Sequence, residues 1–163
     1  MKVLQVMAGA KHGGAEAFFV RLALGLMRAG LDQTVVIRRD EDRARLLRRG
    51  GVEPEQLAFG GLLDLSTAGD LRRIIRRDRP DIVLSWMNRA TAACPKPKGR
   101  FVHVARLGGY YDLKYYRNCD HLVGNTQDIV DYLVKAGWPA ERAHYLPNFV
   151  DARQAPAADR AEL

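Results

Sequence analysis

The sequence has few of the features that mark a secreted, metal-binding or membrane-spanning protein. Its 163 residues include two cysteines, Cys94 and Cys119, without the C-x-x-C spacing of zinc or redox sites, and four histidines without ligand spacing. No window approaches the roughly 18 uninterrupted apolar residues of a membrane span. The short apolar stretch at the amino terminus runs into a polar glycine loop without an A-x-A-like cleavage site, unlike a signal peptide. We therefore expect reduced thiols, no metal or other cofactor, and a cytoplasmic protein.

Acidic residues are in the minority. Asp and Glu number 19 against 26 Lys and Arg, which gives a net charge of +7. The excess lies in two arginine-rich segments, residues 43–49 and 72–79, which we expect on helices. Such a surface can bind anionic lipid headgroups, phosphorylated glycans or nucleic acid, or it can simply be a solvated helix face. Nucleic acid is the least favoured of these ligands, because no aromatic side chains alternate with the arginines to stack on bases.

Short apolar runs rich in β-branched residues alternate with segments of helical periodicity. The runs cover residues 3–7, 34–37, 82–86, 101–105 and 121–123. Strands that are apolar on both faces belong in a parallel sheet covered by helices on either side. Right-handed crossovers then leave few topologies. The pattern predicts a single α/β domain with a doubly wound, Rossmann-like parallel sheet.

Caps and helix breakers mark the ends of the predicted helices. One helix is predicted over residues 15–28, where apolar residues recur at helical spacing, and another over residues 65–78, which precede an Asp-Arg-Pro-Asp break. Asn125 or Thr126 can cap a later helix that runs to Lys135. These helices supply the covering layers that the predicted sheet requires.

A glycine-rich loop follows the first predicted strand. Residues 9–16 read Gly-Ala-Lys-His-Gly-Gly-Ala-Glu and end at the start of the first helix. Free N–H groups at a helix start favour an anion, and glycine lets a ligand approach closely, so phosphate is the first ligand to consider. The spacing matches neither the G-x-G-x-x-G of dinucleotide folds nor the P-loop motif. A tight turn without a ligand is an equal alternative.

Three segments, in this order, resemble the amino-terminal domain of the retaining glycosyltransferases of family 4, which have the two-domain fold called GT-B. They are Gly-Gly-Ala-Glu at residues 13–16, the stretch beginning Val-Gly-Asn-Thr at residues 123–133, and residues 137–151 with their Pro-Asn-Phe-Val-Asp turn. Together they cover nearly the whole chain. The set is similar to the family in order as well as in residue type.

Two positions depart from the pattern of that family. Phe149 stands where the family usually has glycine. The family's frequent histidine at the end of the middle strand is not clearly present, because Arg106 ends that strand and His103 lies inside it. We expect His103 to be packed in the sheet. Arg106 is expected either to contact an anion or a hydroxyl or to form a structural salt bridge.

The resemblance implies that residues 1–151 form an acceptor-binding domain and that residues 152–163 are a linker toward a carboxyl-terminal donor-binding domain. The composition after residue 151, which has no periodic apolar face, agrees with a linker. The whole enzyme would transfer a sugar from a nucleotide-sugar, with retention and without a metal, to a glycan or lipid-linked acceptor such as lipopolysaccharide or a cell-envelope polysaccharide. It would act as a peripheral protein at the anionic inner face of the plasma membrane. The chain alone would be inactive.

The resemblance and the strand ends together suggest roles for individual residues. The amides of Gly13 and Gly14 would approach the donor phosphates. Glu16 and Arg106 are the catalytic candidates, although a carboxylate at position 16 could simply stabilise the helix start. The candidates for acceptor binding are Trp86, Asn88, Arg89, Arg106, Tyr110, Tyr111, Asn125, Thr126 and Asn148.

Several of these side chains have structural alternatives. Trp86 offers a flat face to a sugar ring, whereas Asn88 is equally suited to cap the helix that follows it. The tyrosines of residues 110–116 suit a sugar or a membrane boundary. Packing of a short helix is the commoner role, and on such a helix Tyr111 and Tyr115 would lie one turn apart.

Two other functions stay open from the residues alone. The sheet could serve an NAD-dependent oxidoreductase as its Rossmann domain, although the fingerprint glycines are lacking. It could also be a non-enzymatic, basic α/β module that binds nucleic acid or a partner protein.

Overall fold

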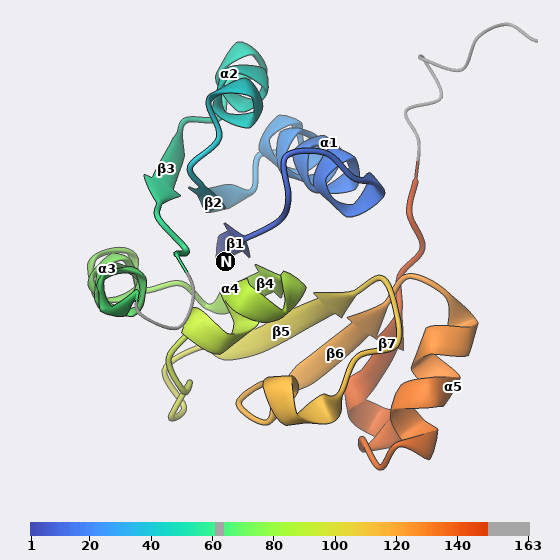
Figure 1. The fold of residues 1–163 in the computed structure, drawn as a ribbon. Coiled ribbons are helices and arrows are strands. Elements are labelled where there is room, and N and C mark those ends of the chain that lie inside the picture. Colours follow the sequence, from blue (N-terminus) through green and yellow to red (C-terminus); the bar gives the residue numbers. More distant parts are fainter. Residues whose placement is uncertain (61–63, 150–163) are drawn as a thin grey trace, which may run out of the picture.

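Parallel strands form a single sheet in the order β3-β2-β1-β4-β5-β6-β7 (Figure 1). The computed structural model describes residues 1–60 and 64–149. The strands are β1 (Lys2–Met7), β2 (Asp32–Arg38), β3 (Pro54–Leu57), β4 (Ile82–Trp86), β5 (Val102–Leu107), β6 (His121–Gly124) and β7 (Ala143–Tyr145). The expected domain boundary at residue 151 and the linker over residues 152–163 lie outside the described residues.

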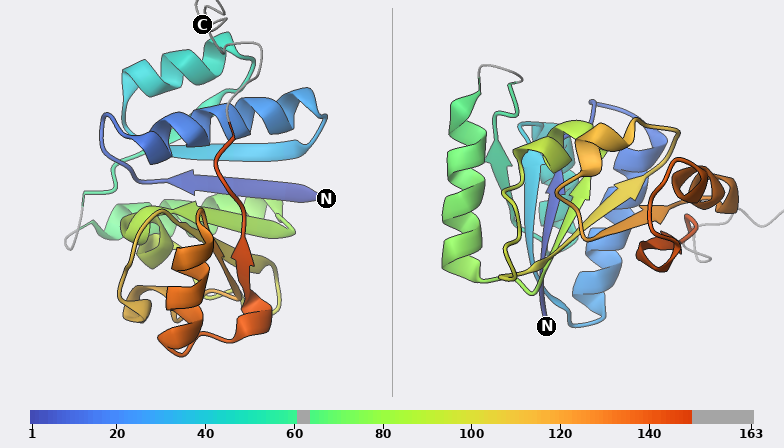
Figure 2. Two further views of the ribbon diagram at one scale, coloured as in Figure 1. Left: turned by 90° about the vertical axis from the view of Figure 1, so that its right-hand side faces the viewer. Right: turned by 90° about the horizontal axis from the view of Figure 1, so that it is seen from below.

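Helices cover both faces of this sheet (Figure 2). They are α1 (Gly14–Arg28), α2 (Glu41–Arg49), α3 (Leu65–Asp78), α4 (Met87–Ala93) and α5 (Gln127–Lys135), with short 3-10 turns η1 (Leu113–Tyr116) and η2 (Ala140–Arg142). Side chains of α1 and α2 pack on one face, and those of α3, α4 and α5 pack on the other. This arrangement confirms the doubly wound α/β fold. No helix among the described residues has the length and apolar character needed to cross a membrane.

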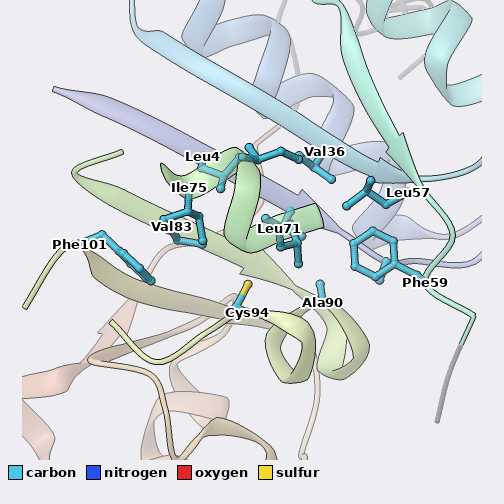
Figure 3. Close-up of a cluster of buried hydrophobic side chains, with 13 residues drawn as sticks. Leu4, Val36, Leu57, Phe59, Leu71, Ile75, Val83, Ala90, Cys94 and Phe101 are labelled. Carbon is cyan, nitrogen blue, oxygen red and sulfur yellow. The ribbon is translucent and has the colours of Figure 1, made fainter. Parts of the chain in front are cut away.

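The strands are apolar on both faces, so each face has its own buried cluster. Beneath α3 and α4, Leu4 and Val83 pack against Leu71 (Figure 3). On the opposite face, Met7 packs with the aromatic side chains Phe18 and Phe19 of α1. Each fully buried side chain of this size stabilises the fold by roughly 1.5–3 kcal/mol relative to an exposed one. The loops at the ends of the strands are therefore attached to a sheet that is packed on both faces.

The structure extends the predicted set of elements in two places. β3 is an edge strand with the sequence Pro-Glu-Gln-Leu, which has no apolar run, and its proline stands at the first position, where an edge strand tolerates it. β7 has three residues and is the closing strand that the family resemblance implies. The helix predicted over residues 65–78 is found with those bounds as α3. The helix predicted to start after Thr126 is α5.

The strand order reverses between β1 and β4. Open α/β sheets bind ligands at such a switch point, outside the carboxyl ends of the strands. The glycine loop follows β1, and Trp86 is the last residue of β4. Arg106 is the second-last residue of the adjacent strand β5. The fold therefore brings several of the predicted site residues to one edge.

Candidate functional site

An uncapped helix start lies at the carboxyl end of β1. Gly13, the residue before α1, has extended backbone angles of φ 165° and ψ 164°, and no side chain caps the helix. The N–H groups of the first turn, beginning with Gly14, have no partner within the helix. They give this edge of the sheet the positive end of the α1 dipole, which favours an anion.

Glu16 fills the inside of the glycine loop. Its side chain is 6% exposed, and its Oε1 accepts a hydrogen bond of 2.8 Å from the backbone N–H of Ala10. A Cβ atom on Gly9 would lie 2.8 Å from the Cγ of Glu16, so only glycine permits this close approach. This contact supports the structural alternative for Glu16, while its candidacy as a catalytic or hydroxyl-binding residue stays a prediction. Glu16 positions the loop.

Arg43 of α2 holds the same loop from the other side. Its guanidinium is buried and donates from Nη2 to the carbonyl oxygens of Ala10 and Lys11, the latter at 3.3 Å. It also pairs with Asp40 at 3.3 Å. The residue at position 10 is therefore held at both its N–H and its carbonyl group. Sequence reasoning missed this contact, because it is tertiary and Arg43 is one of many arginines in an arginine-rich segment.

A second buried cation, Arg106, lies near the carboxyl end of β5. Its side chain is 6% exposed, and its guanidinium carbon lies 4.5 Å from the ring centroid of Phe18 and 5.0 Å from that of Trp86. Nη2 donates to the side-chain oxygen of Asn148 at 2.7 Å and to the carbonyl oxygen of Leu146 at 3.2 Å. The structure thus brings the predicted residues Arg106 and Asn148 together.

The charge of Arg106 has no acidic counterpart among the described residues. Within residues 1–60 and 64–149, its guanidinium forms no ion pair, and its Nε is buried without a hydrogen-bond partner. The alternative of a structural salt bridge is therefore not found. Burial lowers the pKa of Arg106 to about 10, which still leaves the group protonated at neutral pH. A buried, unneutralised cation at a ligand-binding edge is suited to an anionic ligand.

The segment after β7 closes over this cation. The backbone N–H of Leu146 donates to the carbonyl oxygen of Gly124 at 3.0 Å, which extends the sheet by one contact. The chain then reaches α1, where the ring of Phe149 meets that of Phe18 edge-on at 4.9 Å. The phenylalanine that replaces the usual glycine of the family therefore extends the aromatic group beside the guanidinium.

Trp86 does not offer a face to a sugar, which corrects the sequence expectation. Its side chain is 1% exposed and packs against Phe18 and Phe19, with ring centroids 6.0 Å and 5.4 Å away. The position at a strand end placed this residue at the correct edge of the sheet. It could not show that the indole points into the core, where it supports Arg106.

Asn88 and Arg89 face the other side of the sheet from Arg106. Asn88 lies inside the first turn of α4 and does not cap it, because the helix already begins one residue earlier. Its Oδ1 accepts a hydrogen bond from the hydroxyl of Tyr116. Arg89 donates to the carbonyl oxygen of Phe59 at 3.2 Å, in the cluster beneath α3. These two candidates are therefore separated from the α1 side of the edge.

The tyrosine cluster packs against α5. Tyr110 is 61% exposed, its ring lies edge-on to that of Tyr132 at 5.3 Å, and its hydroxyl donates to Asp128. The carbonyl oxygen of Tyr111 accepts a hydrogen bond of 3.1 Å from the hydroxyl of Tyr132. Tyr111 precedes the 3-10 turn η1 that contains Tyr115, so the expected spacing of one helical turn between them is wrong. Tyr110 and Tyr115, which is 44% exposed, are the members of this cluster with a large accessible surface.

The sequence left open whether Asn125 or Thr126 caps α5, and the structure shows that Thr126 does. Thr126 is the cap of α5, since its hydroxyl oxygen accepts a hydrogen bond of 3.2 Å from the N–H of Ile129. The side-chain oxygen of Asn125 is buried and has no hydrogen-bond partner among the described residues. Asn125 lies beside Gly108 in the loop after β5. It therefore adds an unused acceptor to this edge.

His103 is packed in the sheet, as expected. It is fully buried, and its Nε2 lies 2.9 Å from the hydroxyl oxygen of Ser85 on the neighbouring strand. Burial lowers the pKa of His103, so the neutral form is favoured. His103 is the second residue of β5, so it does not correspond to the family's frequent histidine at the end of this strand.

Two hollows of about 430 and 350 Å³ flank the glycine loop, and Arg43 lines both. Gly9 and Arg38 line the first hollow, whereas His12 and Gly13 line the second. The edge that holds the helix start is therefore concave on both sides of the loop.

The model of Glycosyltransferase Family 4 matches residues 12–154. The chain belongs to glycosyltransferase family 4. The family-4 match confirms the resemblance carried by the three sequence segments. A curated relative, the lipopolysaccharide core biosynthesis glycosyltransferase LpsE of Rhizobium meliloti (strain 1021), is 36% identical over the whole chain, which covers 48% of LpsE. The chain thus spans about half the length of the curated family-4 relatives it matches.

Solved structures share the fold of this family-4 chain. Anabaena HepE, in complex with UDP and glucose, superposes with a TM-score of 0.69 at 19% identity, over 93% of this chain and 45% of HepE. The lipopolysaccharide outer core galactosyltransferase WaaB, in its apo form, gives a TM-score of 0.70 at 15% identity, over 99% of this chain and 50% of WaaB. The chain therefore has the fold of one half of such proteins.

Proposed function

We propose that this chain is the acceptor-side half of a retaining glycosyltransferase that transfers a sugar from a nucleotide-sugar to a lipopolysaccharide or another cell-envelope glycan. Family membership supports sugar transfer over the oxidoreductase and the non-enzymatic module that the residues alone left open. The names of LpsE and WaaB support an acceptor of the lipopolysaccharide type. The complex of HepE with UDP and glucose supports a uridine nucleotide in the donor.

The observation that carries this proposal is the convergence of two anion-attracting groups at one edge of the sheet. Phe18, whose ring lies 4.5 Å from the guanidinium carbon of Arg106, stands in α1 one turn after Gly14. The uncapped helix start and the unneutralised guanidinium therefore lie at the same end of the molecule. Departure of a nucleoside diphosphate places negative charge where such groups stabilise it.

The chemistry divides between the two halves of the proposed enzyme. The N–H groups of Gly13 and Gly14 would donate to donor phosphate oxygens, and Arg106 would contribute its positive charge. These groups supply the electrostatic stabilisation that a divalent cation gives in other transferases, so we propose a metal-independent reaction. Most contacts with the nucleotide would come from the second half of the enzyme.

The acceptor would bind on the same edge. Asn125 has a buried side-chain oxygen without a partner among the described residues, Tyr110 has an exposed ring, and the side-chain amide of Asn148 lies beside Arg106. Such groups can orient an acceptor hydroxyl toward the anomeric carbon. We place the enzyme on the cytoplasmic side of the membrane, and we expect the chain alone to transfer no sugar.

The test uses the full-length gene product in which this chain forms the amino-terminal half. Release of nucleoside diphosphate from a panel of nucleotide-sugars would be measured with lipopolysaccharide core acceptors, and NMR would give the configuration of the new glycosidic bond. We expect turnover with retention, and a decrease in kcat of about 10²–10³-fold for Arg106→Gln.

Arg117→Gln, which removes an exposed arginine, is the matched control and should keep its turnover. Inversion of the anomeric centre, or full activity of Arg106→Gln, would contradict the proposal.

A further inference from the structure

We propose that a basic groove on the flank of α3 binds the phosphate headgroups of anionic phospholipids and docks the protein on a membrane surface. This groove lies away from the sheet edge that carries the glycine loop and Arg106, so binding there goes beyond sugar transfer and is independent of it. The groove consists of two adjoining hollows of about 360 and 500 Å³, which share Ile75, Arg76, Arg100 and Phe101.

Cations alone supply the charge of the groove. Its lining includes six exposed basic side chains, namely Arg72, Arg76, Arg79, Lys96, Lys98 and Arg100. No carboxylate lines either hollow. Within the part of the chain that the structure describes, none of the six forms an ion pair. Their positive charges are therefore available to an anionic partner.

Five of the other arginines of the basic segments are already neutralised or occupied, namely Arg43, Arg45, Arg48, Arg73 and Arg77. Arg49 has no ion pair among the described residues. On α3, Arg73 pairs with Asp70 at 2.8 Å, and Arg77 pairs with Asp78 at 2.6 Å. On α2, Arg43 is buried against the glycine loop. The sequence suggested that both arginine-rich helices form an anion-binding surface. The ion pairs favour the face of α3 that lines the groove.

The floor of the groove is apolar. Ile75 and Phe101, which are 9% and 7% exposed, belong to the buried cluster beneath α3, and Figure 3 shows them together at one end of it. Pro80 and Pro95 complete the apolar lining. A rim of cations above an apolar floor matches an amphipathic partner, whose phosphates meet the rim and whose glycerol and upper acyl carbons meet the floor. Nucleic acid fits less well, because no exposed aromatic ring lines the groove to stack on a base.

The backbone fixes two of the cations in uncommon conformations. Arg79, which ends α3, has φ 47°, and Lys98 has φ 49°, so both lie in the left-handed region. The turn that contains Lys98 is closed by a hydrogen bond of 3.0 Å from the N–H of Arg100 to the carbonyl oxygen of Pro97. These conformations set the positions from which the two side chains extend over the groove.

The groove is at the opposite end of the strands from the glycine loop. Pro80 precedes β4 and Phe101 precedes β5, so both mark the amino ends of these strands, whereas Arg106 lies near a carboxyl end. A membrane bound at the groove would leave the carboxyl edge of the sheet free. Docking and ligand binding can therefore occur together.

The test is cosedimentation of the 163-residue chain with phosphatidylcholine vesicles, with and without about one-third phosphatidylglycerol. We expect binding only to the anionic vesicles, and a loss of at least about tenfold between about 50 mM and about 300 mM salt. The double variant R76E/R100E should bind at least about tenfold more weakly than the unmodified chain, because it reverses two cations shared by both hollows.

The matched control is R117E/R142E, which changes the net charge equally at two exposed arginines outside the groove. Circular dichroism checks that both variants are folded. Retained binding in the control, with loss in R76E/R100E, supports the groove. An equal loss of vesicle binding in both variants would show that binding depends on net charge alone, and it would overturn the proposal. Tighter binding of a labelled oligonucleotide than of anionic vesicles at the same salt concentration would also overturn it, in favour of nucleic acid.

Discussion

At the scale of single residues, the two buried arginines near the carboxyl edge of the sheet have different surroundings. Arg43 has a carboxylate partner, Asp40, and backbone acceptors in the glycine loop. Arg106 has two neutral acceptors and two aromatic rings but no carboxylate among the described residues. An unpaired buried charge costs several kcal/mol of solvation free energy, and such contacts offset only part of it. This unneutralised charge supports a role for Arg106 in binding an anion, whereas Arg43 is structural.

Glu16 provides the residue-scale prediction. The variant Glu16→Ala removes the charged acceptor for the N–H of Ala10, so the free energy of unfolding should fall by about 1–3 kcal/mol. The variant Glu16→Gln keeps an oxygen acceptor of similar shape and should lose less than about 1 kcal/mol. Urea denaturation of the chain, followed by circular dichroism, measures both values.

Glu141→Ala, which truncates an exposed glutamate, is the control and should change stability by less than about 0.5 kcal/mol. If Glu16→Ala were as stable as the unmodified chain, the carboxylate would not hold the loop. An equal loss in Glu16→Gln would show that its charge matters and not the hydrogen bond.

Residue positions were easier to predict than residue orientations. The strand-to-helix pattern locates Gly13, Gly14 and Arg106 at one edge, because parallel strands end on the same side. The same rule cannot show that Trp86 points into the core or that Glu16 turns back into its own loop. Those orientations depend on tertiary packing against residues distant in the sequence.

At the scale of elements, helices with clear caps and breakers were predicted closely. Asp64 and Thr126 each accept a hydrogen bond from the helix that they cap, which fixes the starts of α3 and α5. The edge strand β3 was missed because its residues carry no apolar run. β5 begins one residue later than the apolar run and extends to Leu107, which places Arg106 inside the sheet. Pairing with β6 lengthens this strand beyond its apolar residues.

The central strands carry a pH-dependent stability through His103. Its pKa is lowered from the ordinary 6.5, mainly by burial, so the folded state resists protonation. As pH falls below about 6.5, the unfolded chain gains a proton that the folded chain does not, and the free energy of unfolding decreases. The slope from this group cannot exceed about 1.4 kcal/mol per pH unit, the value for one proton.

Urea denaturation between about pH 7 and pH 5 tests this expectation. His103→Gln should show a shallower slope than the unmodified chain, whereas His12→Gln, at an exposed histidine, should keep it. Identical slopes for the unmodified chain and His103→Gln would contradict the assignment.

At the scale of the whole molecule, the two ends of the sheet have separate chemistry. The carboxyl ends hold the uncapped start of α1 and the cation Arg106, and the amino ends border the basic groove beside α3. The chain spans about half the length of its curated relatives, so the carboxyl edge is proposed as one wall of a cleft. The glycine loop then contributes a helix start to a shared site, and its own interior is filled by Glu16.

A crystal structure of the full-length protein with bound UDP would test the proposed phosphate site most directly. We predict that a phosphate oxygen lies within about 3 Å of the N–H of Gly13 or Gly14, with the guanidinium of Arg106 turned toward the diphosphate. A diphosphate bound beyond hydrogen-bonding reach of both the α1 start and Arg106 would contradict the central claim that this edge is the phosphate-facing wall of the cleft.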